Sequence, residues 1–167
     1  MLFVQVYHLI PNRRNCELCP LMYFSSVPQT LYEHAVFLDT SALIELQLQN
    51  PEATDCKNQI DLNFIPTYTT TLVIAETHRR LLHDHGKSLA FSFLSGIFAS
   101  NTMIIRHDKP EDAVAKDLVR QYWDLNLPFC DAVSFAVMLK LGIFKSFTYD
   151  RNHFWAVGFI TYPPFHL

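Results

Sequence analysis

The chain has 167 residues, of which 50% are hydrophobic and 17% are charged, so it can form one domain with a sizeable core and is not a disordered protein. Its 13 Lys and Arg residues against 16 Asp and Glu residues give a formal net charge of −3, which excludes a strongly basic nucleic-acid-binding domain. No apolar run is long enough to cross a bilayer, and the first apolar stretch precedes its basic pair, the wrong order for a secretory signal, so we expect a cytoplasmic protein.

Residues 1–34 differ from the rest of the chain. They mix apolar residues with three prolines and show no sustained helical or strand period, so we interpret them as an N-terminal extension of unknown role before a domain over residues 35–167. Cys16 and Cys19 have the spacing of half a zinc site. Because no second pair of ligands accompanies them, reduced thiols of a cytosolic protein are the simpler interpretation.

The first regular segment begins at residue 36. Apolar residues 36–38 predict a short strand that ends on Asp39, and Thr40 and Ser41 then lead into a helix with apolar residues at positions 43, 44 and 46. A carboxylate at a strand-to-helix turn lies at the carboxyl edge of an α/β sheet, where ligand sites concentrate. Asp39 therefore reads either as a helix N-cap or as part of a functional site.

Strands and helices are expected to alternate along the remainder of the chain. A polar stretch at residues 51–63 precedes a strand at 64–68, and the next helix starts near Thr70 or Thr71 and stops at Gly86. The later expected elements are a helix over 89–97, a strand at 103–105, a helix after an Asp108 and Glu111 capping pair, a helix opened by Asp131 and closed by Gly142, and strands at 147–149 and 158–161. This order predicts an α/β fold, a three-layer α/β/α sandwich around a mainly parallel sheet.

Three of four candidate carboxylates occupy positions where an unpaired charge would be costly. Asp39 and Asp150 end apolar strands, Glu76 interrupts an apolar helix face, and Asp131 opens a helix. A buried carboxylate costs several kcal/mol unless it is paired or binds a metal. Taken singly, each has an ordinary structural interpretation: a helix N-cap for Asp39 and Asp131, an ion pair within its helix for Glu76, and a turn for Asp150.

The expected topology brings the four carboxylates to one edge of the sheet, which changes this interpretation. Gathered there, they would raise one another's pKa values by repulsion. Hard divalent cations such as Mg²⁺ or Mn²⁺ relieve that repulsion and prefer oxygen ligands. The sequence therefore predicts a metal site, without defining the reaction at that site.

Four segments stand in a specific order: VFLDTSAL at residues 36–43, IAE at 74–76, DAVSFA at 131–136, and TYDRNHF at 148–154 followed by Gly158 and Phe159. Together they resemble the motifs of the PIN-domain family, as found in VapC-type toxin ribonucleases, over residues 36 to about 162. Two positions depart from the family pattern. Cys130 stands where the family often has Thr or Ser, and the closing motif has one additional residue before His153, which we interpret as a packed or surface histidine.

The resemblance implies a metal-dependent endoribonuclease, the toxin of a type II toxin-antitoxin pair. Its carboxylates would hold one or two Mg²⁺ or Mn²⁺ ions, and an activated water would attack an RNA phosphodiester, leaving a 5′-phosphate and a 3′-hydroxyl. The resemblance further implies a homodimer and a small antitoxin that inhibits it. The residues it assigns to the site are Asp39, Glu76, Asp131 and Asp150, with Thr40 or Ser41 orienting a ligand or water.

Other functions remain open on the sequence alone. A non-catalytic PIN-like interaction module would be expected to have lost its carboxylates, and a solitary RNA-processing nuclease would have no antitoxin partner. A phosphatase with an Asp39 nucleophile would normally need a second acid two positions later, where Ser41 stands. The candidate phosphate contacts, for which solvated surface charges are the simpler interpretation, are Arg79, Arg80, Arg120, Lys140 and Arg151.

Overall fold

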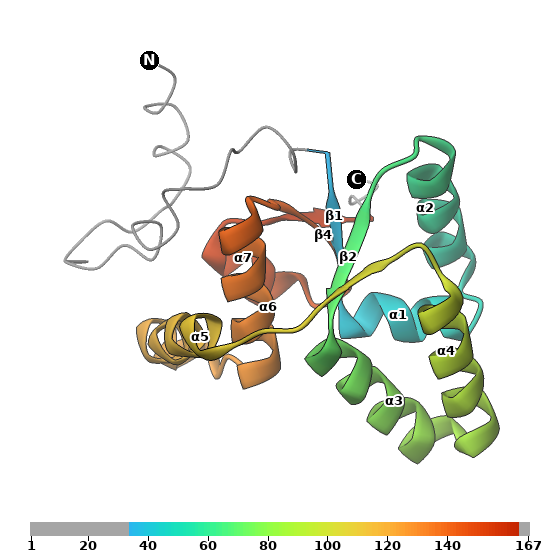
Figure 1. The fold of residues 1–167 in the computed structure, drawn as a ribbon, viewed down its shortest axis with the longest axis horizontal. Helices are drawn as coiled ribbons and strands as arrows, with labels where there is room; N and C mark the ends of the chain where they lie inside the picture. Colours follow the sequence, from blue (N-terminus) through green and yellow to red (C-terminus); the bar gives the residue numbers. More distant parts are fainter. Residues whose placement is uncertain (1–33, 164–167) are drawn as a thin grey trace.

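A five-stranded parallel sheet forms the centre of the protein in the computed structural model, which describes residues 34–163 (Figure 1). The strand order is β3-β2-β1-β4-β5, and every neighbouring pair is parallel. The strands are β1 (Val36–Leu38), β2 (Thr67–Thr70), β3 (Met103–Ile105), β4 (Lys145–Phe147) and β5 (Ile160–Tyr162). In the register of the central strand β1, Val36 lies opposite Thr67 of β2 and Lys145 of β4.

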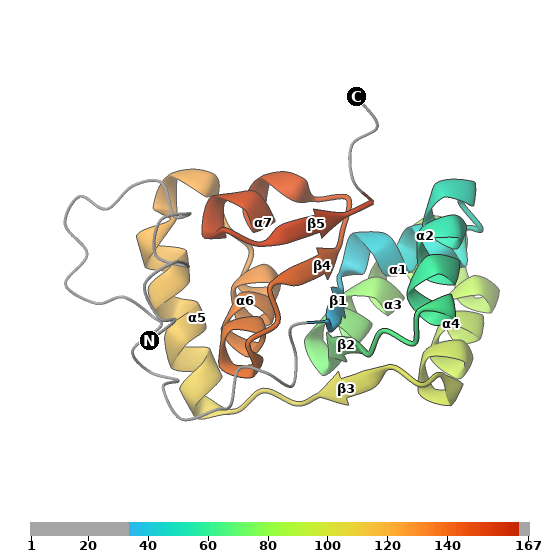
Figure 2. The ribbon, with the colours of Figure 1, turned by 90° about the horizontal axis from the view of Figure 1, so that it is seen from above.

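Helices cover both faces of the sheet, as the sequence predicts (Figures 1 and 2). One layer comprises α1 (Thr40–Gln47), α2 (Pro51–Leu62), α3 (Thr71–His85) and α4 (Lys87–Ala99). The other comprises α5 (Lys109–Gln121), α6 (Phe129–Leu141) and α7 (Arg151–Val157), with the short 3₁₀ helix η4 (Trp123–Leu125) between α5 and α6. The predicted three-layer α/β/α sandwich is confirmed. None of the described helices is both long and apolar enough to span a membrane.

The path of the chain through the sheet creates a crevice beside the central strand. From β1 the chain proceeds outward to β2 and β3, and it then returns to place β4 on the opposite side of β1. Connections on the two sides of such a switch point diverge to opposite faces of the sheet, which leaves a crevice at the carboxyl ends of the two strands. Asp39 directly follows β1, and Thr148 directly follows β4.

Aromatic side chains fill the core on both faces of the sheet, because Phe37 and Phe147 lie one register position apart on neighbouring strands and so point to opposite faces. Phe37, Phe135, Phe147 and Phe154 are fully buried. The rings of Phe135 and Phe154 meet edge to face with their centroids 4.8 Å apart. Each buried phenylalanine contributes up to about 3 kcal/mol relative to an exposed one, so the contact between Phe135 and Phe154 fixes α7 against α6.

Two helices differ from the sequence-based expectations. The polar stretch at residues 51–63 forms α2, which starts with Pro51 after the N-cap Asn50, whose side chain accepts a hydrogen bond from Ala53 N. Only Ala53 and Ile60 of α2 are buried, so its apolar period is too weak to predict a helix. The short helix α7 was also not expected, and its one buried residue is Phe154.

Strands β1 and β3 have the predicted bounds, whereas the bounds of the other three strands shift by one to three residues. Strand β2 covers 67–70 instead of 64–68, β4 covers 145–147 instead of 147–149, and β5 covers 160–162 instead of 158–161. Threonines occupy the buried carboxyl half of β2, where their hydroxyls find partners: Thr69 Oγ1 donates to Leu38 O at 2.9 Å. The predicted N-terminal extension, with Cys16 and Cys19, lies outside the described residues apart from residue 34.

Candidate active site

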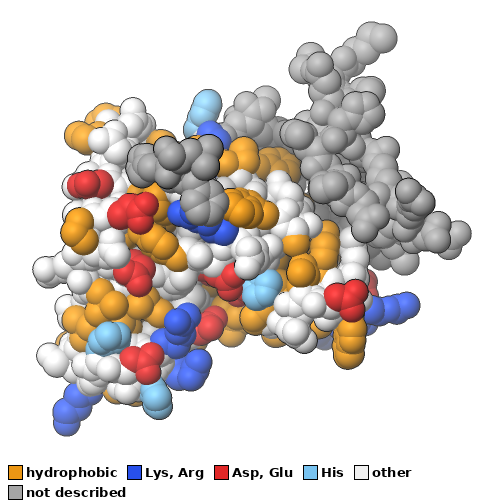
Figure 3. Space-filling model, turned by 180° about the vertical axis from the view of Figure 1, so that it is seen from behind, with side chains coloured by type: hydrophobic (Ala, Val, Ile, Leu, Met, Phe, Trp, Pro, Cys, Tyr) orange, Lys and Arg blue, Asp and Glu red, His pale blue; other side chains and the backbone are white. Residues whose placement is uncertain are grey.

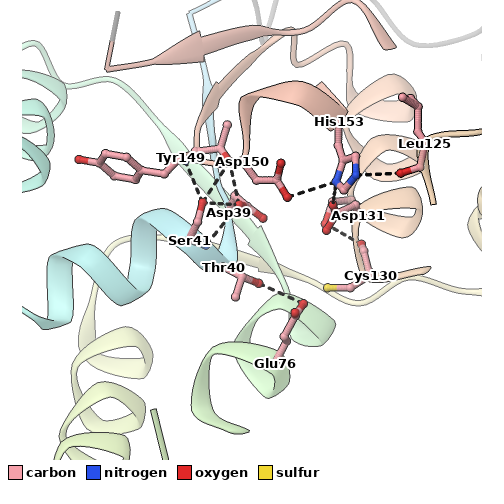
Figure 4. A network of polar contacts seen from close by, with 12 residues as sticks. Asp39, Thr40, Ser41, Glu76, Leu125, Cys130, Asp131, Tyr149, Asp150 and His153 are labelled. Atoms are coloured by element: carbon pink, nitrogen blue, oxygen red, sulfur yellow. Dashed lines mark hydrogen bonds and ion pairs between the residues drawn. The ribbon is translucent and has the colours of Figure 1, made fainter. Parts of the chain in front are cut away.

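Asp39 lies at the carboxyl end of β1 with only 4% of its surface exposed. Its Oδ2 atom accepts three hydrogen bonds, from Ser41 N at 3.2 Å, Ser41 Oγ at 2.7 Å and Thr148 Oγ1 at 2.8 Å (Figure 4). The first of these caps α1, so the N-cap interpretation is confirmed. Burial raises the pKa of the carboxyl group, and the bonds from Ser41 and Thr148 oppose that rise.

Two hydroxyl groups connect the end of β1 to the loop between β4 and α7. Ser41 Oγ accepts from Tyr149 N at 2.8 Å, and Thr148 Oγ1 accepts from Asp150 N at 3.0 Å. Each hydroxyl has a single proton, and both protons point to Asp39, so the 3.1 Å contact between the two oxygens is not a third donated bond. Ser41 and Thr148 therefore fix the Asp39 carboxylate from both sides of the crevice.

Glu76 lies on α3, in its second turn after the N-cap Thr70. Its Oε2 atom accepts a hydrogen bond from Thr40 Oγ1 at 3.3 Å, a contact between residues 36 positions apart. The ion pair with Arg79 or Arg80, considered as its structural explanation, is not formed in the described part of the chain. The Glu76 carboxylate thus points toward the carboxyl end of β1 (Figure 4).

Asp131 is the third residue of α6, which begins at Phe129 after the N-cap Pro128. The interpretation of Asp131 as an N-cap is therefore wrong, because the helix starts two residues earlier. Asp131 is 9% exposed. Burial, followed by repulsion from Asp39, raises the pKa of the Asp131 carboxyl to about 7, although the contact with His153 opposes the rise.

His153 lies between two of the carboxylates. Its Nδ1 atom is 3.0 Å from Asp131 Oδ2 and 3.2 Å from Asp150 Oδ2, and its Nε2 atom is 3.2 Å from Leu125 O. A carbonyl oxygen only accepts, so Nε2 carries a proton and donates to Leu125. The sequence reasoning treated His153 as a packed or surface residue and missed this contact; its position three residues after Asp150, one helical turn away, was the available signal.

Cys130 adds a thiol beside the carboxylates. The pKa of this thiol is raised, first by burial and then by the neighbouring carboxylates of Glu76, Asp131 and Asp39. The thiol is therefore neutral and unreactive at physiological pH. This residue occupies the position where the sequence departs from the PIN pattern, and the structure places its sulfur next to Glu76 and Asp131.

The donor atoms are close enough to hold a cation. Those of Glu76, Cys130 and Asp131 lie within 4.8 Å of one another, and so do those of Asp131, Asp150 and His153. Asp131 belongs to both groups, and the Asp39 charge acts on it directly. The four carboxylates predicted from the sequence are thus brought to one edge of the sheet. Their oxygen-rich donor set and the raised pKa of Asp131 fit a hard divalent cation.

The exposure of the carboxylates is uneven across the cluster. Asp39 and Asp131 are buried, whereas 47% of the Asp150 side chain is exposed. The His153 side chain is 19% exposed, so the cluster reaches the surface at Asp150 and His153. The two buried carboxylates can anchor an ion while the outer one faces solvent and any bound substrate.

The structure thus defines the class of the protein, an α/β/α sandwich with carboxylates gathered at the switch point of a parallel sheet. Within that class, the family model described as PIN domain matches residues 36–159. The chain therefore belongs to the PIN-domain family. Among curated proteins, none matches the chain in sequence.

Solved structures with the same fold include three from bacteria. The VapC20 structure from Mycobacterium tuberculosis, a Sarcin-Ricin loop cleaving toxin, has a TM-score of 0.67 and 23% identity, over 75% of this chain and 97% of that chain. The DNA-bound VapBC structure from Salmonella typhimurium has a TM-score of 0.60 and 15% identity, over 76% and 95% of the two chains. The FitAcB structure from Neisseria gonorrhoeae has a TM-score of 0.58 and 17% identity, over 79% and 99%.

Proposed function

We propose that this PIN domain is a metal-dependent endoribonuclease and the toxin of a type II toxin-antitoxin pair. The observation that carries the proposal is the cluster of Asp39, Glu76, Asp131 and Asp150 at the carboxyl edge of the sheet. The fold shared with VapC20, a toxin that cleaves the Sarcin-Ricin loop, supports RNA as the substrate.

Each carboxylate has a distinct role in this proposal. Asp39 and Asp131 are the principal ligands of Mg²⁺ or Mn²⁺, because they are buried and have raised pKa values that a cation would lower again. Glu76, oriented by Thr40, and the exposed Asp150 complete the ligand set or position a water. Ser41 keeps the Asp39 carboxylate in place.

A bound divalent ion would lower the pKa of a water ligand and neutralise the charge that develops on the phosphodiester. The residues of the chain supply the remainder of the arrangement. The hydrogen bonds from Ser41 and Thr148 fix Asp39, and His153 holds the carboxylates of Asp131 and Asp150 toward each other. Attack of water on the phosphorus would leave a 5′-phosphate and a 3′-hydroxyl.

The proposal includes two protein partners and a cellular location. A small antitoxin would inhibit the enzyme by inserting a basic side chain among the carboxylates, whose mutual repulsion favours any cation. The fold shared with the VapBC and FitAcB structures supports such a partner. We further propose a homodimer that acts in the cytoplasm, where its RNA substrate would be found.

The test is cleavage of labelled RNA by the purified protein with Mn²⁺, Mg²⁺ or EDTA. Asp39→Asn and Asp131→Asn should abolish cleavage, whereas Asp117→Asn, which removes the same charge from the exposed face of α5, should retain it. The product ends should be a 5′-phosphate and a 3′-hydroxyl. No cleavage of varied RNAs by the wild type, together with no Mn²⁺ binding in calorimetry, would refute the proposal in favour of a non-catalytic interaction module.

A further inference from the structure

Helix α3 extends beyond Glu76 with a cationic face. Residues three, four and seven positions apart lie on one side of an α-helix, so Arg79, Arg80 and His83 follow Glu76 along the same face. All three are exposed. The opposite face of α3 is buried and contains Val73, Ile74, Thr77 and Leu81. This exposed face therefore begins at a candidate metal ligand and has two arginines in the next helical turn.

Neither arginine is held by a carboxylate at ion-pair distance within the described residues. Asp84 is the nearest acid that follows them on the helix. Its Oδ1 atom is 2.5 Å from His83 Nδ1, and this contact lowers the pKa of Asp84 more than the charge of Arg80 does. Figure 3 shows Lys and Arg side chains gathered toward the α3 end of this face, next to the central carboxylates. In a chain of net charge −3, this is a local concentration of positive charge at the site.

We propose that Arg79 and Arg80 bind the RNA phosphates next to the scissile bond, so that the RNA backbone runs from the carboxylate cluster along α3. This proposal rests on the proposed ribonuclease function. The arginines lie one helical turn, about 5.4 Å, beyond Glu76 along the helix axis. A guanidinium group presents donors that match phosphate oxygens in pairs. The positive charge also offsets the repulsion that RNA meets on approaching four carboxylates.

RNA is a better ligand for this face of α3 than an acidic protein segment, because the face begins at Glu76, a candidate metal ligand. A phosphodiester bound at the candidate metal ligands has neighbouring phosphates on both sides, since the nucleic-acid backbone has one charge per nucleotide. Glu76 is one of those ligands, and the arginines are the next exposed groups on its helix face. Arg79 and Arg80 thus act as positioning residues for the substrate and do not take part in the chemical step.

The experiment compares two double variants that lose the same charge. Arg79→Gln with Arg80→Gln removes the proposed contacts, and Lys109→Gln with Lys116→Gln removes two exposed charges from the outer face of α5. Lys109 is distant from the site. It stands two residues before Glu111, which pairs with Lys140, and Lys140 lies nine residues, or about 14 Å along α6, from Asp131. All the substituted side chains are exposed, so thermal unfolding should be unchanged in both variants.

The measurement is binding of a labelled mixed-sequence single-stranded RNA in EDTA, from 50 to 200 mM salt, followed by cleavage of the same RNA in Mn²⁺. In the arginine variant, the slope of log affinity against log salt concentration should be less steep by about 1.4. The factor by which affinity falls between 50 and 200 mM salt should therefore be about sevenfold smaller than in the wild type. The arginine substitutions should also raise KM more than they lower kcat, and the lysine variant should match the wild type. An unchanged slope in the arginine variant, with wild-type cleavage intact, would overturn this proposal alone and point to an acidic protein partner. Absence of both binding and cleavage in the wild type would overturn the proposed function itself.

Discussion

Asp131 should make the metal-free protein less stable as the pH rises from 4 to 7. The pKa of its carboxyl is raised from an ordinary value of 3.8 to about 7. Between these values the folded chain keeps a proton that the unfolded chain has released, so the free energy of unfolding decreases with pH by up to about 1.4 kcal/mol per unit. Over about three units the loss reaches about 4 kcal/mol, and it should be absent from Asp131→Asn.

The assay is urea unfolding in EDTA between pH 4 and pH 8, for the wild type and for Asp131→Asn. The remaining carboxylates titrate in both proteins, so the difference between the two curves isolates Asp131. The wild type should lose stability relative to the variant up to pH 7 and then remain level, and Mn²⁺ should restore the loss only in the wild type. Parallel curves across this range would show that Asp131 is ionised in the folded protein at low pH, and would refute the reasoning.

Three further substitutions test other contacts. Thr148→Val keeps the side-chain shape but removes the hydroxyl that donates to Asp39, so Mn²⁺ affinity measured by calorimetry should fall about tenfold, and an unchanged affinity would contradict the role of this hydroxyl. Glu111→Gln should lower the free energy of unfolding by about 2 kcal/mol in urea at pH 7, since Glu111 is 1% exposed, has a pKa lowered to about 2 and pairs with the half-exposed Lys140. Gly142→Ala should cost about 1 kcal/mol in thermal unfolding because φ is +69° and the added Cβ meets no atom; no loss would mean that the backbone relaxes there.

The parts of the fold that the sequence predicts have strong local signals. The strand before Asp39, the stop of α3 at Gly86, the capping box of Asp108 and Glu111, and the end of α6 at Gly142 all depend on residues close together in the chain. The helices α2 and α7 were missed because their stability comes from elsewhere. Helix α2 buries two residues, and α7 depends on the packing of one aromatic ring in a core that other elements complete.

The candidate site also combines features that local sequence signals predict with features that depend on distant residues. Three of its four carboxylates are predictable because each occupies a position where an unpaired charge would be unfavourable, and Asp131 is predictable from its place at the start of a helix. The contacts that orient them depend on sheet register and helix packing, which short sequence patterns do not define. Thr148 reaches Asp39 across 109 positions, since β1 and β4 pair with Phe37 opposite Ser146. His153 reaches Asp131 only because α7 packs beside α6.

The pairing of the first strand with the fourth determines when the site can exist during synthesis. Asp39 leaves the ribosome 109 positions before Thr148, which together with Asp150 completes its surroundings. Parallel pairing across so long a separation is slow and cannot precede the arrival of the later strand. A nascent chain therefore has no assembled carboxylate cluster until strand β4 and Asp150 have left the ribosome, and any activity of that cluster must wait for them.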